Sequence, residues 1–234
     1  MAIDDLPMPV VNFLNVIGVE WPYINEDSLC EFGRLVREFG QAVRTTHDDA
    51  TATIHALGSS YQGAAYTQLR NRWTEMSATH VTELVDACGV VADACDAAAA
   101  YVVGQKVVAV GELVGMAATF FADQAAAVAT AGLAEAAVPV IIAAAKKLGE
   151  SLIQDLEQYL IGQLVEAAIK PLFAKVEQAM QGLQWQGGAG ATVESAFQVD
   201  TAQMLAHAAA MHGHADTFAQ HARNFAAQAA AISF

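Results

Sequence analysis

The feature that most constrains this chain is a seven-residue repeat over residues 197–232. Large apolar side chains recur every seven positions, at Phe197, Met204, Met211, Phe218, Phe225 and Ile232. Small side chains keep the same period, at Thr201, Ala208, Ala215, Ala222 and Ala229. Such a heptad is typical of a helix that buries one stripe against another helix. The segment therefore predicts a terminal helix whose large and small residues form a partner-binding seam, with the partner inside the chain or outside it.

Three histidines flank this seam, and a polar pair marks the start of its helix. Asp200 followed by Gln203 resembles a capping box, so the helix is expected to begin there. His207, His214 and His221 lie seven apart and lack the i,i+3 or i,i+4 spacing of a metal-binding pair. They are expected to form a solvated face. The alternative is a pH-responsive face, because histidine gains charge at about pH 6.5 and that charge would loosen packing beside the seam.

Upstream, apolar positions at helical spacing predict a long helical hairpin. Asn25 is the expected N-cap of a helix over residues 26–57. Gly58-Ser59-Ser60 interrupts the pattern, which resumes in a second helix over residues 63–100. Hydrophobic residues make up 55% of the chain and aromatic ones only 8%, which favours closely packed helices. The predicted fold class is therefore all-α, an elongated antiparallel helical bundle that contains this hairpin.

The remaining segments complete the bundle. Residues 10–17 predict a short helix, residues 107–145 predict buried helices with a GxxxG at 111–115, and Pro171 is expected to kink or restart an amphipathic helix. Gly187-Gly188-Ala189-Gly190 is the best candidate for a linker. The predicted domains are a helical bundle over 1–186, a Gly-rich linker over 187–196 and the heptad helix over 197–234.

Charge and motif content exclude several classes of function. The net charge is −14 and no Lys/Arg-rich run occurs, which argues against nucleic acid and anionic membrane surfaces as partners. Cys30, Cys88 and Cys95 lack CxxC spacing and predict buried thiols, not disulfides or a zinc site. Neither a nucleophile elbow nor a P-loop nor a dinucleotide motif is present. The sequence therefore predicts no enzyme activity, no metal and no cofactor.

The ends and the apolar centre of the chain bear on its export. Asp4 and Asp5 stand where a Sec signal peptide would carry positive charge, which argues against Sec export. Glu112, Asp123 and Glu135 interrupt the apolar region, so no uncharged run of about 20 residues is left to span a membrane. A different export route is expected.

The most informative local motif is Tyr61-Gln62-Gly63, which lies between the two long helices and is followed by Trp73. An aromatic residue followed by a glycine two positions later suits a tight turn that joins two helices. The motif resembles the Trp-x-Gly turn of the WXG family of type VII secretion substrates, with Tyr61 in place of the family's Trp. Together with Gly18-Val19-Glu20-Trp21-Pro22 and the long Ala/Val-rich region, it makes most of the chain similar to the WXG-like N-terminal domain of actinobacterial polymorphic and necrotizing toxins.

This resemblance implies export through a type VII (ESX) system to the cell surface or beyond. It also implies pairing with small helical-hairpin WXG-type proteins or with itself, and a toxin activity that belongs to a separate domain. The match to the family's Tyr-x-x-x-Asp/Glu export signal is Tyr23 to Asp27, which precedes the hairpin, whereas the family places its signal after the second helix. An ordinary helix start is the alternative for these two residues.

Two functions of different classes follow. The first is a non-catalytic secretion substrate, or the targeting and partner-binding domain of a toxin, that acts through helix–helix packing. The alternative is a membrane-active, pore-forming protein whose helices over 107–145 insert after a trigger.

Overall fold

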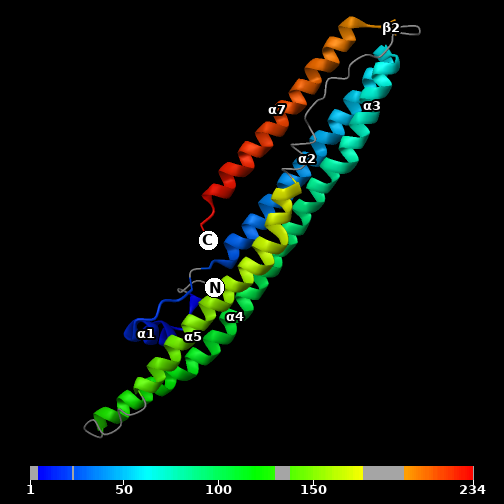
Figure 1. Cartoon of the computed structure of the whole chain (residues 1–234). Helices are drawn as coiled ribbons and strands as arrows, with labels where there is room; N and C mark the ends of the chain where they lie inside the picture. Colours follow the sequence, from blue (N-terminus) through cyan, green and yellow to red (C-terminus); the bar gives the residue numbers. More distant parts are fainter. Residues whose placement is uncertain (1–4, 23, 130–137, 176–197, 234) are drawn as a thin grey trace. The chain divides into compact units, whose positions relative to one another are not determined.

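The computed structural model describes residues 5–22, 24–129, 138–175 and 198–233. Over these residues the chain is all-α, which confirms the predicted fold class (Figure 1). The elements in chain order are α1 (Met8–Ile17), α2 (Glu26–Ser60), β1 (Tyr61–Gln62), α3 (Ala64–Met76), the π-helix η2 (Ser77–Val81), α4 (Thr82–Ala129), α5 (Val138–Tyr159), the π-helix η3 (Leu160–Ile169), β2 (Gln198–Val199) and α7 (Thr201–Ala231).

The chain divides into two compact units. The first unit comprises Met1–Glu31, Ala94–Glu166 and Ser233–Phe234, and the second comprises Phe32–Asp93 and Ala167–Ile232. The long helices α2 and α4 each contribute residues to both units. The linker predicted over 187–196 lies outside the described residues, so the predicted domain boundaries stay a prediction.

Local chemistry explains where the first helices begin and end. α1 ends at Gly18, whose φ of 66° is the left-handed conformation that glycine adopts without steric cost. The Asn25 side chain accepts a hydrogen bond from the Asp27 N–H at 2.9 Å, as expected for the N-cap of α2. α2 then runs through Gly58 to Ser60, three residues beyond its predicted end. A Cβ at Gly58 would lie 2.5 Å from the Tyr66 hydroxyl oxygen, so this glycine accommodates an aromatic neighbour and does not end the helix.

The second arm of the hairpin is longer than predicted. α3, η2 and α4 follow one another without a break in helical structure, so the arm reaches Ala129 and does not stop near residue 100. The Ala/Val-rich stretch contains isolated glycines but no proline, and an isolated glycine weakens a helix without ending it. Near Pro171 the chain also stays helical, with the wider turns of η3 just before it.

The core of the first unit forms where α1 packs on α4. Val10, Phe13 and Leu14 of α1 are almost fully buried, and the Phe13 ring lies 5.2 Å from the Phe120 ring, centroid to centroid. Tyr101 of α4 stacks on Tyr159 of α5 at 3.8 Å. The first contact holds the short N-terminal helix on α4, and the second joins α4 to α5.

A buried ion pair joins the start of α2 to α4 in the same unit. The Lys106 Nζ lies 2.9 Å from the Glu26 Oε2 and donates a hydrogen bond to the Ile24 carbonyl at 2.5 Å. Lys106 is only 1% exposed, and burial lowers its pKa, an effect that the negative charges of Asp27 and Asp5 oppose. Loss of either partner would leave a buried charge without compensation.

Two predictions about burial are partly wrong. Cys88 and Cys95 are buried as expected, and burial raises the pKa of the Cys88 thiol to about 11, but Cys30 is exposed on α2. The region over 107–145 was expected to be buried, yet Val107 and Val108 are more than half exposed. The apolar content of α4 exceeds what its neighbours in the first unit cover.

Candidate helix-docking interface

The predicted turn motif lies at one end of the hairpin in the second unit. Tyr61 and Gln62 form β1, which pairs antiparallel with β2 so that Tyr61 faces Val199 and Gln62 faces Gln198. Gly63 has a φ of 157°, a conformation that side-chain-bearing residues rarely adopt, while a Cβ there would meet no atom within 4 Å. Glycine is therefore favoured at this turn by the backbone conformation and not by a lack of space for a side chain.

Trp73, the third residue of the predicted turn motif, lies away from the turn and joins the two arms. Its Nε1 donates a hydrogen bond to the Thr51 Oγ1 at 2.8 Å, and its ring stacks on His47 at 5.1 Å and 11°. His47 is 8% exposed, and this burial lowers its pKa, an effect that the negative charge of Asp48 opposes. The sequence analysis did not identify His47, because a lone histidine on a helix carries no signal of its partner.

Two ion pairs set the antiparallel register of the hairpin. Arg37 of α2 lies 3.0 Å from Asp93, and Arg44 lies 3.9 Å from Asp86 of α4. The two arginines are seven residues apart on α2, and the two aspartates are seven residues apart on α4, so both ion pairs fit one antiparallel register. Between them, a Cβ at Gly40 would come within 3.0 Å of the Cys88 Cβ, which shows how closely the two helices approach. Exposed pairs of this kind contribute little energy, about 0.2–1 kcal/mol each, but they oppose a shifted pairing.

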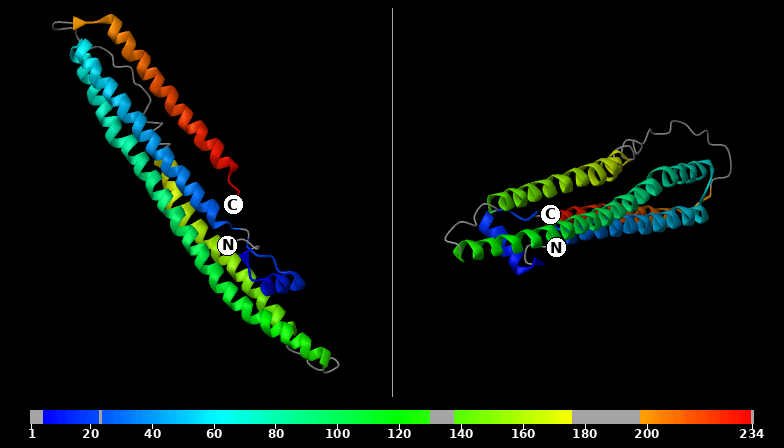
Figure 2. Two further views of the ribbon diagram at one scale, coloured as in Figure 1. Left: turned by 180° about the vertical axis from the view of Figure 1, so that it is seen from behind. Right: turned by 90° about the horizontal axis from the view of Figure 1, so that it is seen from below.

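The terminal helix α7 packs antiparallel on α2 in the second unit, as the views of Figure 2 show. The Phe225 ring lies 5.0 Å from Phe39 and 6.2 Å from Phe32, centroid to centroid. Phe32 and Phe39 are seven residues apart on α2, so they present one face to the seam. This aromatic cluster is the apolar part of the interface.

Polar pairs continue the same face toward the turn. The Thr46 Oγ1 lies 3.0 Å from the His221 Nε2, and the Thr53 Oγ1 lies 3.0 Å from the His214 Nε2. Both the threonines and the histidines are seven residues apart, so the two pairs are equivalent rungs of one register. Beyond them the Ser60 Oγ donates to the Gln203 Oε1 at 2.6 Å. The hydroxyls of α2 thus match the polar residues of α7 along the seam.

A capping box needs a bond from the cap side chain to the first turn and a bond from the third residue's side chain back to the cap, and α7 has only the first. The Asp200 side chain accepts hydrogen bonds from the N–H groups of Ala202 and Gln203, each at 3.1 Å. The Gln203 side chain, expected to complete the capping box, accepts from Ser60 of α2 instead. The start of α7 is therefore fixed by α2 as well as by its own cap.

The seam differs from the prediction in which side of it packs. His207, His214 and His221 are half-buried, and two of them hydrogen-bond to α2, so they do not form a solvated face. Ala208, Ala215 and Ala222 are exposed, although Ala229 is half-buried. The histidines and the alanines both lie next to the large residues of the heptad, but only the histidines face the hydroxyl groups of α2 and form hydrogen bonds with them.

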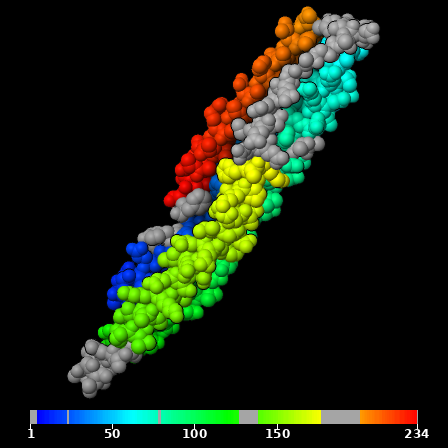
Figure 3. All heavy atoms as spheres, viewed as in Figure 1, coloured from blue at the N-terminus to red at the C-terminus, as the bar shows by residue number. Residues whose placement is uncertain are grey.

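The large seam residues make a shallow contact. Met211, Phe218, Phe225 and Ile232 are half-buried, whereas Met204 is 40% exposed, and Phe197 lies outside the described residues. No residue of α7 between Thr201 and Ala231 is fully buried. In the space-filling view this helix forms a continuous strip of surface (Figure 3). α7 is therefore held on the hairpin by one partly covered stripe.

The residues proposed as an export signal are only partly described. Asp27 is exposed in the first turn of α2, and its N–H is bonded to the Asn25 side chain. Tyr23 lies outside the described residues. The structure therefore shows Asp27 in a helix start and leaves the signal itself a prediction.

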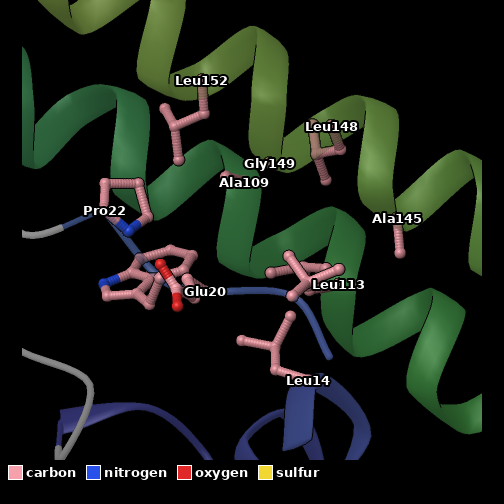
Figure 4. Close-up of a pocket in the computed structure, with 11 residues that line it drawn as sticks. Leu14, Glu20, Pro22, Ala109, Leu113, Ala145, Leu148, Gly149 and Leu152 are labelled. Atoms are coloured by element: carbon pink, nitrogen blue, oxygen red, sulfur yellow. The ribbon is translucent and has the colours of Figure 1, made fainter. Parts of the chain in front are cut away.

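The first unit contains a small apolar crevice. It is lined by α1, the segment after it, α4 and α5, with Leu14, Leu113 and Leu152 pointing into it (Figure 4). Glu20 is the one ionisable residue in its lining. Within the described part of the chain, no three His, Cys, Asp or Glu side chains cluster closely enough to hold a metal ion. The lining of the crevice is that of a contact between packed helices.

Comparison with known proteins agrees with this geometry. A WXG100-like domain matches residues 5–146, which include α1, the hairpin and the start of α5. No curated protein and no solved structure matches the chain. The matched region covers more than half of the 234 residues. The chain therefore belongs to the WXG100-like domain family, a family of helical proteins associated with type VII secretion.

Proposed function

We propose that this protein is a non-catalytic type VII secretion substrate, or the targeting and partner-binding domain of a polymorphic toxin, that acts through helix–helix packing. The observation that carries the proposal is the contact between α7 and α2 on the hairpin of a WXG100-like domain. One face of the hairpin accepts an amphipathic helix in a defined antiparallel register. In this chain α7 occupies that face, and the partners that we propose for helix packing of the same kind are small helical-hairpin WXG-type proteins or a second copy of the chain.

The interface combines two kinds of interaction that suit specific recognition. The cluster of Phe225 with Phe32 and Phe39 supplies apolar burial, at roughly 25 cal/mol per Å² before the costs of association. The Thr–His rungs add little net energy, about 1 kcal/mol each, but they are lost if the register slips by one residue. Polar groups of this kind select one partner and one alignment from the many that apolar helices allow.

Export by a type VII route to the cell surface or beyond is part of the same proposal, with Tyr23 and Asp27 as its candidate signal. A secretion assay in a bacterium with an intact or an inactivated type VII system tests it. We expect the chain in the medium of the intact strain only, and less of it after Asp27→Ala. Equal export by both strains would contradict the proposal.

Partner binding has its own test at the turn of the hairpin. Gly63→Val strains the backbone at a φ of 157°, whereas Gly213→Val places its side chain in open space on α7. We expect Gly63→Val, but not Gly213→Val, to reduce the amount of stoichiometric complex with a co-expressed WXG-type protein, measured by light scattering coupled to size exclusion. A chain that forms no complex with any such protein would argue against the proposal.

The pH response predicted for His207, His214 and His221 belongs to this interface. The Thr53 hydroxyl donates its one proton to the Asp49 carbonyl at 3.0 Å, so the His214 Nε2 acts as the donor to Thr53. Both the neutral Nε2–H tautomer and the charged imidazolium provide that donor. This hydrogen bond is therefore kept in both forms, so any pH response would have to come from the charge itself beside the seam. An unfolding midpoint of α7 that is the same at pH 7.5 and 5 would exclude the pH response.

A membrane-active protein is the second candidate function, and one observation favours it. α4 is long and apolar enough over Thr82–Ala126 to cross a membrane by length and composition, a test that a core helix also passes. Glu112 and Asp123 oppose simple insertion, because charged side chains are costly in the centre of a bilayer. Dye leakage from liposomes at pH 7 and pH 5 separates this function from helix packing.

A further inference from the structure

The face of α2 that carries Phe32, Phe39, Thr46 and Thr53, called the α2 face below, is covered by a helix that the family match does not include. The matched WXG100-like domain contains all of α2 but ends at residue 146, and α7 lies wholly after it. The face therefore belongs to the hairpin of the family, whereas its cover comes from another part of the chain (Figure 2). A partner helix reaches this face only while α7 is away from it.

The contact that α7 makes with the α2 face is weak enough to open. No residue of α7 is fully buried, and its large residues Met211, Phe218 and Phe225 are only half-buried. The hydrogen bonds from His214 and His221 add little net free energy, because water replaces them when the helices separate. A helix attached by one partly covered stripe opens at a lower free energy than the helices of the core, and segments that move are drawn from this class.

The contacts at the turn of the hairpin provide a hinge for this opening. β2 pairs with β1 directly before α7, and the Asp200 N–H donates to the Ser60 carbonyl at 3.0 Å. These backbone contacts fix the start of α7 beside the end of α2. Toward its other end the helix is held by the Phe225 cluster, and beyond the helix the Ser28 hydroxyl donates to the Ser233 carbonyl at 2.5 Å. Opening from that end separates the seam and keeps the paired strands together.

We propose that α7 is an autoinhibitory gate, which occupies the α2 face until a helix of a partner protein displaces it. The inference rests on the proposed helix-packing function and adds how access to the hairpin is controlled. The closed gate keeps Phe32 and Phe39 from forming an exposed apolar patch, which would promote non-specific association. The helix that fits the open face carries a large apolar residue for Phe39 and, farther along, polar side chains seven residues apart for Thr46 and Thr53.

A gate has a signature that a purely structural helix lacks. A competing helix binds with its intrinsic affinity multiplied by the fraction of chains in which α7 is open. A substitution that weakens α7 therefore tightens binding at α2, although the substituted residue is not part of the binding face. We expect Phe225→Ala to raise the open fraction about thirtyfold, which is roughly 2 kcal/mol at 1.4 kcal/mol per tenfold. If α7 only supported the hairpin, the same substitution would leave binding unchanged or weaken it.

Fluorescence anisotropy of a labelled synthetic peptide, with the wild-type sequence of residues 200–233, tests the gate in the full chain. We expect the peptide to bind the Phe225→Ala chain about thirtyfold more tightly than the wild-type chain. Leu205→Ala is the matched control, because Leu205 is 73% exposed on the same helix and its truncation should leave peptide binding unchanged. Adding Phe39→Ala to Phe225→Ala should remove most of the gain, since the peptide then loses the ring that its own Phe225 contacts.

Equal peptide affinity of the wild-type and Phe225→Ala chains would overturn the gate. An equal gain with Leu205→Ala would do the same, as would a gain that persists with Phe39→Ala, because the peptide would then lie away from the α2 face. Phe225→Leu, a smaller change, should give an intermediate gain and replaces Phe225→Ala if that chain does not fold.

The peptide assay contains no partner protein, so the gate and the proposed function fail in different ways. The expected peptide results, without a complex with any WXG-type protein, would count against the proposed function alone. A WXG-type complex that forms with the same affinity in the wild-type and Phe225→Ala chains would overturn the gate alone.

Discussion

The attachment of α7 to the hairpin gives the sharpest stability prediction. Phe225 is half-buried, and its ring contacts both Phe32 and Phe39. Truncating a fully buried phenylalanine costs about 3–5 kcal/mol, so the half-covered ring accounts for roughly 2 kcal/mol, including its aromatic contacts. No residue of α7 is fully buried, so this one side chain makes a large contribution to holding the helix in place.

Native-state hydrogen exchange measures this contribution directly, because it reports the free energy of opening for each helix. We expect Phe225→Ala to lower the opening free energy of α7 by roughly 2 kcal/mol and to leave that of α5 unchanged. Leu205→Ala is the matched control, since Leu205 lies on the same helix and is 73% exposed. If both variants change the exchange of α7 equally, the aromatic cluster does not hold the helix and our account of the seam is wrong.

Three further predictions concern other parts of the fold. Burial lowers the pKa of His47 in the folded state, so the unfolded chain binds more protons below about pH 6.5, and the unfolding free energy should fall from pH 7 to pH 5 by at most about 1.4 kcal/mol per pH unit. Urea titrations should show a smaller fall in His47→Gln. Lys106→Ala should lower the unfolding free energy by about 3–5 kcal/mol in the same assay, because it leaves Glu26 buried without its partner, and Lys106→Met with Glu26→Leu should recover most of the loss. Gly63→Val should lower the thermal midpoint through about 1–3 kcal/mol of backbone strain, whereas Gly213→Val should not, and equal midpoints would show that the turn tolerates a side chain.

Local sequence was sufficient to predict the class of fold and most helix starts. Asn25 and Asp200 cap their helices as predicted, since a cap depends on residues within one turn of it. The helix ends were less predictable. α2 runs through Gly58 because the Tyr66 side chain lies against that glycine, and this neighbour is set by the closure of the hairpin.

The sequence also contains an indication of the hairpin register, in the matching spacing of two arginines and two aspartates, which our sequence analysis did not use. Arg37 and Arg44 are spaced like Asp86 and Asp93, and the antiparallel helices bring each arginine to one aspartate. Lys106 shows the opposite case. It lies among apolar residues of α4, and its partners, Glu26 and the Ile24 carbonyl, are about 80 residues earlier, so only the folded chain brings them together.

The terminal helix shows most clearly what sequence and tertiary structure each decide. The heptad by itself determined that Phe218 and Phe225 share one stripe, because a period of seven returns to the same side of a helix. It did not determine which flank of the stripe packs, since His221 is three residues after Phe218 and Ala222 is four, and both positions adjoin a large residue. The hydroxyl groups of α2 decided this, because they pair with the histidines and leave the alanines at the surface.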